Sequence, residues 1–258
     1  MTLEYAGGRY SGWQKQLNAR TVQGELERAI AETFGHDDFE CQGSGRTDAG
    51  VHAMMQVAHL EVHLRMPLEK LRRQINEALP ADVNVLAIAK AHHRFHARHA
   101  AVARSYLYQV SRRRSAFAKP FAWWVKEPLD LAVMIDAATR FSGMHDFRSF
   151  SDDDPEDKST AVLIEHVTVG EDGDLILIRI AGSHFLWKMV RRMVGVIVEI
   201  GRGGLPIRAI DDFLRQPSGT PARLTAPASG LFLERVFYEG DEREHPLVAA
   251  FPVRSRAS

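Results

Sequence analysis

The order of the predicted strands and helices is the feature that most constrains how this chain can fold. Apolar residues with periods of two and about four predict strand, helix, strand, strand, helix, strand over residues 2–5, 22–34, 39–42, 54–64, 67–79 and 83–89. The same order recurs, with strands predicted over 102–110, 162–169, 175–180 and 231–238 and helices over 131–141 and 185–200. A short further helix is predicted over 206–215. Two β-α-β-β-α-β units in one chain predict an α+β protein with two ferredoxin-like halves.

The boundary between the halves is predicted within 97–103, which gives an N-terminal half over residues 1–100 and a C-terminal half over 101–258. Each half is expected to form a mostly antiparallel sheet with its helices on one face. The opposite faces are then free to form a central cleft. An acidic loop over 152–158 and the tail beyond Gly240 are expected to lie at the periphery.

Several local signals fix the expected ends of these elements. Thr21 is suited to cap the first helix, and Gly35 to close it. Pro67 is expected to start the second helix and Pro80 to stop it. A tight turn at Asp172-Gly173 is expected to join two strands.

Composition places the chain among soluble proteins. Its 258 residues are 45% hydrophobic, which is enough for a sizeable core. The single cysteine, Cys41, excludes an intrachain disulfide and is typical of a reducing compartment. No apolar run of 18 residues and no signal peptide are visible, so we expect a cytoplasmic protein that does not span a membrane.

Positive charge is concentrated in one stretch, although the formal net charge is zero. From Val83 to Lys126 there are nine Lys or Arg residues, four His and no acidic residue. A basic face of this kind would steer a polyanion to one surface. A solvated basic face without a partner is the alternative, and charge alone does not separate the two.

The loop between the third and fourth predicted elements could carry chemistry. Over residues 43–53 it contains three glycines, Arg46 and Asp48. Glycines allow close approach of a ligand, and an Asp near an Arg stays ionised and can attack carbon as a nucleophile. The alternative is a hairpin loop in which Asp48 caps a turn. A dinucleotide fingerprint is excluded because the third glycine position is Asp48, and a phosphate-binding Gly-Lys-Ser/Thr is absent.

A resemblance to a known family covers nearly the whole chain. The segment Gly-Arg-Thr-Asp-Ala-Gly-Val-His-Ala over 45–53 resembles the catalytic motif of the bacterial tRNA pseudouridine synthase A family. Further segments similar to that family, in the same order, lie at residues 10–16, 95–98, 103–108, 146–150, 185–191, 225–227 and 230–231. One position departs from the pattern, because Val162 stands where the family has an Arg.

The resemblance implies a reaction and a set of roles. The reaction is isomerisation of uridine to pseudouridine in the anticodon stem-loop of tRNA, at tRNA positions 38–40, without cofactor or metal. Asp48 is the implied nucleophile and Arg46 the residue that holds the flipped base out of the RNA. Tyr106 is implied to stack on the uracil and to relay a proton. Arg191 is implied to approach Asp48 from the other half and pair with it across an RNA-binding cleft.

Substrate contacts are implied at residues that include Tyr106 and Arg46, together with His52, Phe95, Arg98, Arg104 and Leu231. Several of these have a plainer alternative. Arg46 could be a simple salt-bridge partner of Asp48, Arg191 a surface residue of an amphipathic helix, and Tyr106 or Leu231 a core residue. Family members act as homodimers that lay tRNA across both subunits, so a homodimer is expected here too.

Three other functions remain open at this point. A base-releasing N-glycosylase would use the same carboxylate, and a noncatalytic RNA-binding protein could use the same scaffold. A metal-dependent nuclease would draw on His92, His93, His96 and His99, but no second cluster of metal ligands accompanies them.

Overall fold

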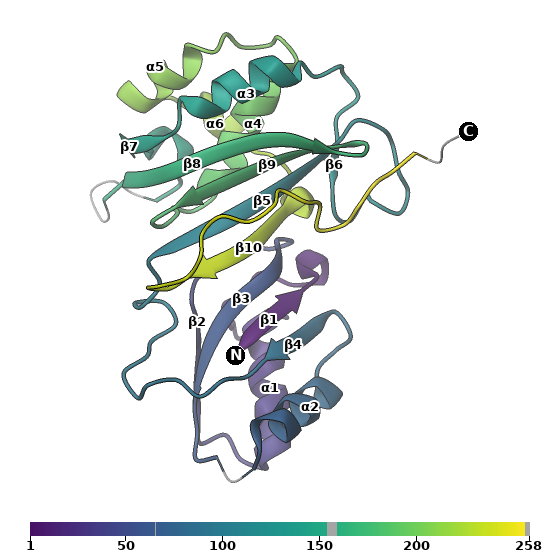
Figure 1. Ribbon diagram of the computed structural model, residues 1–258, viewed down its shortest axis with the longest axis vertical. Helices are drawn as coiled ribbons and strands as arrows, with labels where there is room; N and C mark the ends of the chain where they lie inside the picture. The colour runs from purple at the N-terminus through teal and green to yellow at the C-terminus, as the bar shows by residue number, and fades with distance from the viewer. Residues whose placement is uncertain (65, 154–158, 256–258) are drawn as a thin grey trace. The chain divides into compact units, whose positions relative to one another are not determined.

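The computed structural model describes residues 1–64, 66–153 and 159–255, and its contacts divide the chain into two compact units (Figure 1). The first unit contains Met1–Val102 and Phe232–Glu242. The second contains Ala103–Leu231 and the C-terminal segment from Arg243. Both are mixed α+β units with mostly antiparallel sheets, as predicted.

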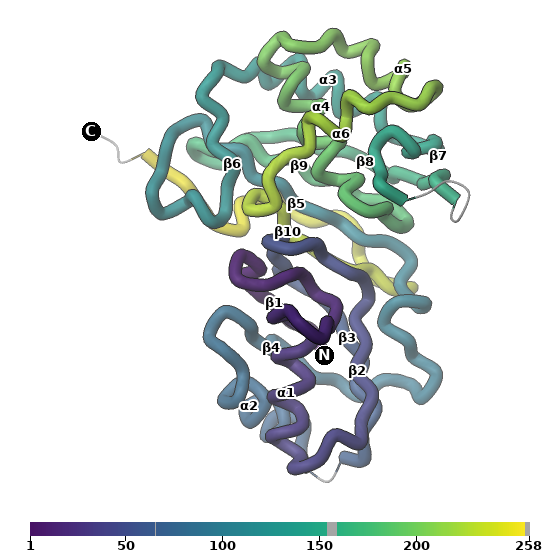
Figure 2. Tube along the Cα trace, turned by 180° about the vertical axis from the view of Figure 1, so that it is seen from behind, coloured from purple at the N-terminus to yellow at the C-terminus, as the bar shows by residue number. Residues whose placement is uncertain are grey.

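The first unit contains the six predicted elements in the predicted order, namely β1 (Thr2–Tyr5), α1 (Val22–Phe34), β2 (Glu40–Gly43), β3 (His52–Glu61), α2 (Leu68–Ala78) and β4 (Val83–Ala87). Its strands are ordered β4-β1-β3-β2, and every neighbouring pair is antiparallel. The two helices pack against each other, and Figure 2 shows them beside the strands of this unit.

A strand from the far end of the chain completes this sheet. Residues Phe232 and Leu233 of β10 (Leu231–Phe237) pair in parallel with His52 and Ala53 at the start of β3. The sequence predicts this strand in the second half, whereas its contacts place Phe232–Glu242 in the first unit. Pairing between strands so distant in sequence leaves no local signal.

The local signals of the first unit act as predicted. The Thr21 side chain accepts a hydrogen bond from the Gly24 N–H at 3.2 Å, which caps α1. Gly35 closes the same helix with a φ of +74°, a conformation that favours glycine. Helix α2 begins directly after Pro67 and ends before Pro80.

The second unit contains β5 (Ala103–Ser111), β6 (Trp123–Trp124), α3 (Leu131–Thr139), β7 (Gly143–Asp146), β8 (Ala161–Asp172), β9 (Leu175–Gly182), α4 (Met189–Gly201), α5 (Ala209–Arg215) and α6 (Thr220–Arg223). Strands β5, β9, β8 and β7 pair antiparallel in that order, and β6 pairs in parallel with β5. Helices α3 and α4 pack together, and α3 covers β8 (Figure 1). Every residue of β9 is buried.

Three expectations for the second unit were wrong in detail. The helix predicted from residue 185 begins at Met189, because Lys188 has a φ of +62° and cannot continue a right-handed helix. The turn between β8 and β9 lies at Gly173-Asp174, one residue later than predicted, and Gly173 has a φ of +60°. The short strands β6 and β7 were not predicted, because two to four residues do not establish a period.

The C-terminal tail is fastened to the second unit, although most of its described residues beyond Gly240 are exposed or half-buried. Val253 is only 3% exposed, and its carbonyl accepts a hydrogen bond from the Asp174 N–H at 2.8 Å. The Arg179 guanidinium donates to the carbonyls of His245 and Pro246 at 2.9 and 2.8 Å. The tail therefore packs along β9 as part of the second unit.

Two further expectations concern loops and membranes. Of the predicted acidic loop, Asp152 and Asp153 are described, whereas residues 154–158 lie outside the described residues. Within the described ranges, none of the helices has the length and apolar character needed to cross a bilayer.

Candidate active site

The loop that carries Asp48 runs from β2 to β3 and is fastened at its start to β3. The backbone N–H of Ser44 donates to the Val57 carbonyl at 2.7 Å, and its hydroxyl donates to the Gln56 side-chain oxygen at 2.7 Å. The Gln56 amide in turn donates to the Gly45 carbonyl at 3.0 Å. Ser44 and Gln56 are both buried, so these polar groups fix the direction in which the loop leaves the sheet.

A second set of contacts fastens the middle of the loop on either side of Asp48. The buried Thr47 shares a hydrogen bond of 2.8 Å with the Tyr5 hydroxyl, and its carbonyl accepts from the Trp13 N–H at 3.0 Å. After Asp48, the Gly50 N–H donates to the Tyr10 carbonyl at 3.3 Å. The loop backbone is therefore held rigidly while Asp48 itself remains half-buried.

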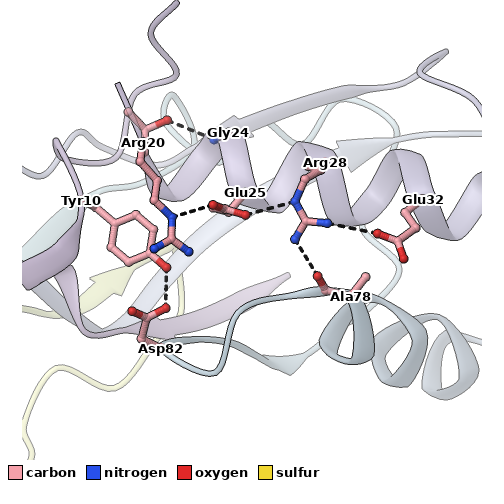
Figure 3. A network of polar contacts seen from close by, with 9 residues as sticks. Tyr10, Arg20, Gly24, Glu25, Arg28, Glu32, Ala78 and Asp82 are labelled. Carbon is pink, nitrogen blue, oxygen red and sulfur yellow. Dashed lines mark hydrogen bonds and ion pairs between the residues drawn. The ribbon is translucent and has the colours of Figure 1, made fainter. Parts of the chain in front are cut away.

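Tyr10, which anchors the far side of the loop, belongs to the polar network in Figure 3. Its hydroxyl donates to Asp82, and the Arg20 guanidinium carbon lies 4.9 Å from the centre of its ring. Arg20 is bound in turn by Glu25 at 2.7 Å. Burial, followed by the hydrogen bond to Asp82, raises the pKa of Tyr10, so the hydroxyl stays protonated and keeps donating.

Two predicted substrate-contact residues near the loop have different exposures. Arg46 is exposed, and its Nε donates to the Gln14 side-chain oxygen at 3.2 Å. His52 is only 1% exposed; its Nδ1 accepts from the Gly7 N–H at 3.0 Å and its ring stacks on Phe232 at 4.8 Å. These contacts make His52 a support for the start of β3.

A groove of about 870 Å³ lies beside the loop within the first unit. Trp13 and Gln14 line it next to Gly45 and Arg46 of the loop, and Arg98 lines it as well. Its walls also carry carboxylates, including Glu27, which pairs with Lys15 at 2.6 Å. The groove therefore presents charges of both signs and is not a uniformly basic surface.

The residues after β4 lie along the first unit. The half-buried Phe95 packs at 5.1 Å from the Tyr238 ring, and the Tyr238 hydroxyl donates to the Ala97 carbonyl at 2.8 Å. Arg98 follows as an exposed residue. Several histidine rings here lie within 4.2 to 4.6 Å of one another, but no three His, Cys, Asp or Glu residues in the described ranges are arranged to hold a metal ion.

The remaining predicted residues belong to the second unit. Tyr106 is half-buried on β5, and its ring meets Phe185 edge-on at 5.0 Å. Arg104, two residues earlier, donates to the Ser183 carbonyl at 3.1 Å. Arg191 is half-buried in the first turn of α4, where its Nε donates to the Ala226 carbonyl at 2.7 Å. Leu231, at the start of β10, is 4% exposed.

The structure thus collects Arg46, Asp48, His52, Phe95 and Arg98 in the first unit. It collects Arg104, Tyr106, Arg191 and Leu231 in the second. The expected pairing of Asp48 with Arg191 joins one unit to the other and stays a prediction.

Sequence reasoning missed the residues that support these side chains. Tyr5 and Gln56 hold the loop but stand outside its motif. In the second unit the fully buried Tyr108 donates to the Pro227 carbonyl at 2.8 Å, and a Cβ on Gly230 would come within 2.6 Å of its ring. Tyr108 and Gln56 stand among other polar residues of β5 and β3, so nothing local marked them as buried groups that need partners.

Known proteins resemble this chain over most of its length. The family model described as tRNA pseudouridine synthase matches residues 1–99 and 137–239. The tRNA pseudouridine synthase A 2 of a Bacillus cereus strain is 35% identical over 239 residues, which cover 92% of this chain and 97% of the relative. The tRNA pseudouridine synthase A of Aquifex aeolicus is 37% identical over 238 residues, with the same coverages. That of Moorella thermoacetica is 38% identical over 242 residues, which cover 92% of this chain and 98% of the relative.

Proposed function

We propose, starting from the fact that this chain belongs to the tRNA pseudouridine synthase A family, that Asp48 is the nucleophile with which it isomerises uridine to pseudouridine in tRNA. The chain is an isomerase: the uracil leaves its N-glycosidic bond, turns and reattaches through carbon. Nothing is oxidised or hydrolysed, so the reaction requires neither a redox cofactor nor a metal.

The observation that carries the assignment is the way the loop presents Asp48. The carbonyl of Thr47 and the N–H of Gly50 are both held by the N-terminal segment, while Asp48 between them is half-buried. A nucleophile must meet the target atom at a fixed distance and angle, and a loop held on both sides supplies that geometry before substrate binds. A merely turn-capping Asp needs no such support.

The other site residues receive roles by family resemblance. Arg46, exposed beside Asp48, inserts into the RNA and holds the target base out of its stack. Tyr106 stacks on the extruded uracil and relays a proton. Arg191 pairs with Asp48, for which an Arg suits because its guanidinium stays charged when partly buried.

Substrate contacts complete the proposed site. Arg98 and Arg104 contact phosphates, which position RNA without reading its sequence. Phe95 and Leu231 shape the pocket around the nucleotide, and the buried His52 supports that pocket by holding the start of β3.

The finer architecture belongs to the same proposal. The β4-β1-β3-β2 antiparallel order of the first unit supports a description as a ferredoxin-like half, with a second such half beginning near residue 101. We infer a cytoplasmic homodimer that binds tRNA in a cleft between the halves and modifies positions 38–40 of the anticodon stem-loop.

The test compares wild type with Asp48→Asn on unmodified tRNA, using mass mapping of pseudouridine. The variant is expected to make none while binding tRNA within about threefold of wild type, because Asn keeps the size of the side chain and removes the nucleophile. Asp38→Asn, an exposed carboxylate before β2, serves as the matched control and is expected to behave as wild type.

Two outcomes would contradict the proposal. Pseudouridine formed by Asp48→Asn would remove Asp48 as the nucleophile. Free uracil released by wild type, in place of an isomer of unchanged mass, would identify an N-glycosylase instead.

A further inference from the structure

The residue before helix α4 has an unusual backbone. Among the described residues, Lys188 is the only non-glycine with a positive φ, at +62°. Side chains other than glycine are strained in this left-handed conformation, and such strain persists only where the surroundings impose it. Lys188 lies three residues before Arg191, so its backbone sets how the first turn of α4 begins.

Two neighbouring carboxylates contact the segment that contains Lys188. Asp152 accepts from the Lys188 ammonium at 2.6 Å and also pairs with Arg192. Asp153 accepts from the backbone N–H of Trp187 at 2.9 Å. The backbone is thus held just before Lys188 by Asp153, while Asp152 holds the side chains of Lys188 and Arg192 on either side of Arg191.

The ion pair with Asp152 matters because the charge of Arg192 is buried. Its side chain is 5% exposed, and its Nε has no hydrogen-bond partner among the described residues. The ion pair with Asp152 is therefore the main compensation given to a buried charge. A buried ion pair adds little net stability because both charges lose their hydration, but it holds the two side chains in one arrangement.

Arg191 is held between this arrangement and the segment before β10. Its Nε donates to the Ala226 carbonyl at 2.7 Å, and its own carbonyl accepts from the Ala226 N–H at 3.0 Å. Behind it, the Arg192 N–H donates to the Lys188 carbonyl at 3.1 Å. The first turn of α4, which carries Arg191, therefore begins at Lys188 and is fastened to Ala226.

We propose that Asp152, with Asp153, is a positioning residue that holds Lys188 in its left-handed backbone and thereby aims Arg191 at the reaction centre. This inference rests on the proposed role of Arg191. Asp152 contacts neither substrate nor reacting atoms in this role, and acts only through Lys188 and Arg192.

The test measures kcat and KM for tRNA with Asp152→Asn, Asp152→Glu and Lys188→Gly. Asp152→Asn is expected to lower kcat on the order of 10- to 100-fold, because small misplacements of a catalytic group have effects of that size. KM should change less than about threefold, since Arg191 acts on the reaction and not on binding. Asp152→Glu should recover most of the lost kcat by restoring the charge.

A double variant separates positioning from stability. Glycine adopts a φ of +62° without strain, so Asp152→Asn should lower kcat by less than about threefold when Lys188 is already Gly. Asp211→Asn is the matched control: Asp211 pairs with Arg140 at 3.6 Å, is as exposed as Asp152, and should leave kcat unchanged.

The outcomes are distinguishable. If the active wild type and a folded Asp152→Asn have equal kcat, the positioning role is wrong while the proposed function stands. If Asp152→Asn folds but lowers kcat as much in the Lys188→Gly background as in wild type, the proposal is overturned. If Asp152→Asn does not fold, a folded Asp152→Glu variant with a fully lost kcat overturns it. A wild type that makes no pseudouridine overturns both.

Discussion

A Cβ atom on Gly12 would lie 2.5 Å from the carbonyl oxygen of Thr47, the residue that precedes Asp48. The same carbonyl accepts the N–H of Trp13 at 3.0 Å, and Gly12 has a φ of +89°. The N-terminal segment therefore passes the loop that carries Asp48 with no space for a side chain, and only glycine satisfies both the contact and the backbone conformation.

Gly12→Ala is accordingly expected to destabilise the protein by about 1–3 kcal/mol and to lower kcat, because the loop must move away from the added methyl group. Urea unfolding and single-turnover kinetics measure the two effects. Gly8→Ala is the control, since a Cβ on Gly8 meets nothing within 4 Å. Equal stability of the two variants would show that the close approach is not tight.

The hydrogen bond between Tyr5 and Thr47 offers a second test of the loop support. Both residues are buried and their hydroxyls lie 2.8 Å apart. Tyr5→Phe and Thr47→Val should each lower the free energy of unfolding by about 1 kcal/mol, and the double variant by less than the sum. Denaturant melts of all four proteins complete the cycle, and strictly additive effects would argue against a direct bond.

Gly195 lies inside α4, and its replacement by Ala should change stability in the opposite direction to that usual for a helical glycine. Gly→Ala within a helix normally stabilises by about 1 kcal/mol. Here an added Cβ would lie 1.7 Å from the Leu224 carbonyl, so Gly195→Ala should instead destabilise by at least about 2 kcal/mol. A thermal melt decides the sign, and a raised Tm would mean that the Leu224 segment gives way freely.

Sequence patterns predicted the elements of the first unit well because their signals are local. Thr21, Gly35 and the prolines around α2 act within a turn of their own positions. The start of α4 was predicted too early because Phe185 and Leu186 continue the apolar period. The residues at the break, Trp187 and Lys188, instead contact Asp153 and Asp152, which are distant in sequence.

The candidate nucleophile was identified from its motif, but its support was not. Asp48 and Arg46 lie in one short run, while Tyr5, Gln56 and Tyr10 reach the loop from other strands and loops. The partner of β10 was equally hidden, because pairing between its Phe232 and the start of β3 leaves no mark in either local sequence. Tertiary contacts of this kind become visible only when the strand order is known.

His59 should make the stability of the first unit depend on pH. Its Nδ1 accepts from the Ala97 N–H at 3.2 Å, and its ring lies 4.6 Å from that of His96. Burial, followed by the neighbouring His96, lowers the pKa of His59 below its usual value of 6.5; the nearby Glu61 and Glu40 act in the opposite direction. The folded protein therefore favours the neutral ring. The resulting contribution to stability is full above pH 6.5 and is lost as pH falls from there through the lowered pKa of the folded state.

His59→Asn tests this expectation, because the Asn side-chain oxygen can accept the same N–H without titrating. Between about pH 7.5 and pH 5, wild type should lose more of its free energy of unfolding than the variant does. Urea melts at half-unit pH steps give the free energy of unfolding of each protein. The titration of groups common to both proteins cancels when the variant's value is subtracted from that of wild type. Parallel curves over this range would show that His59 has the same proton affinity in the folded and unfolded chains.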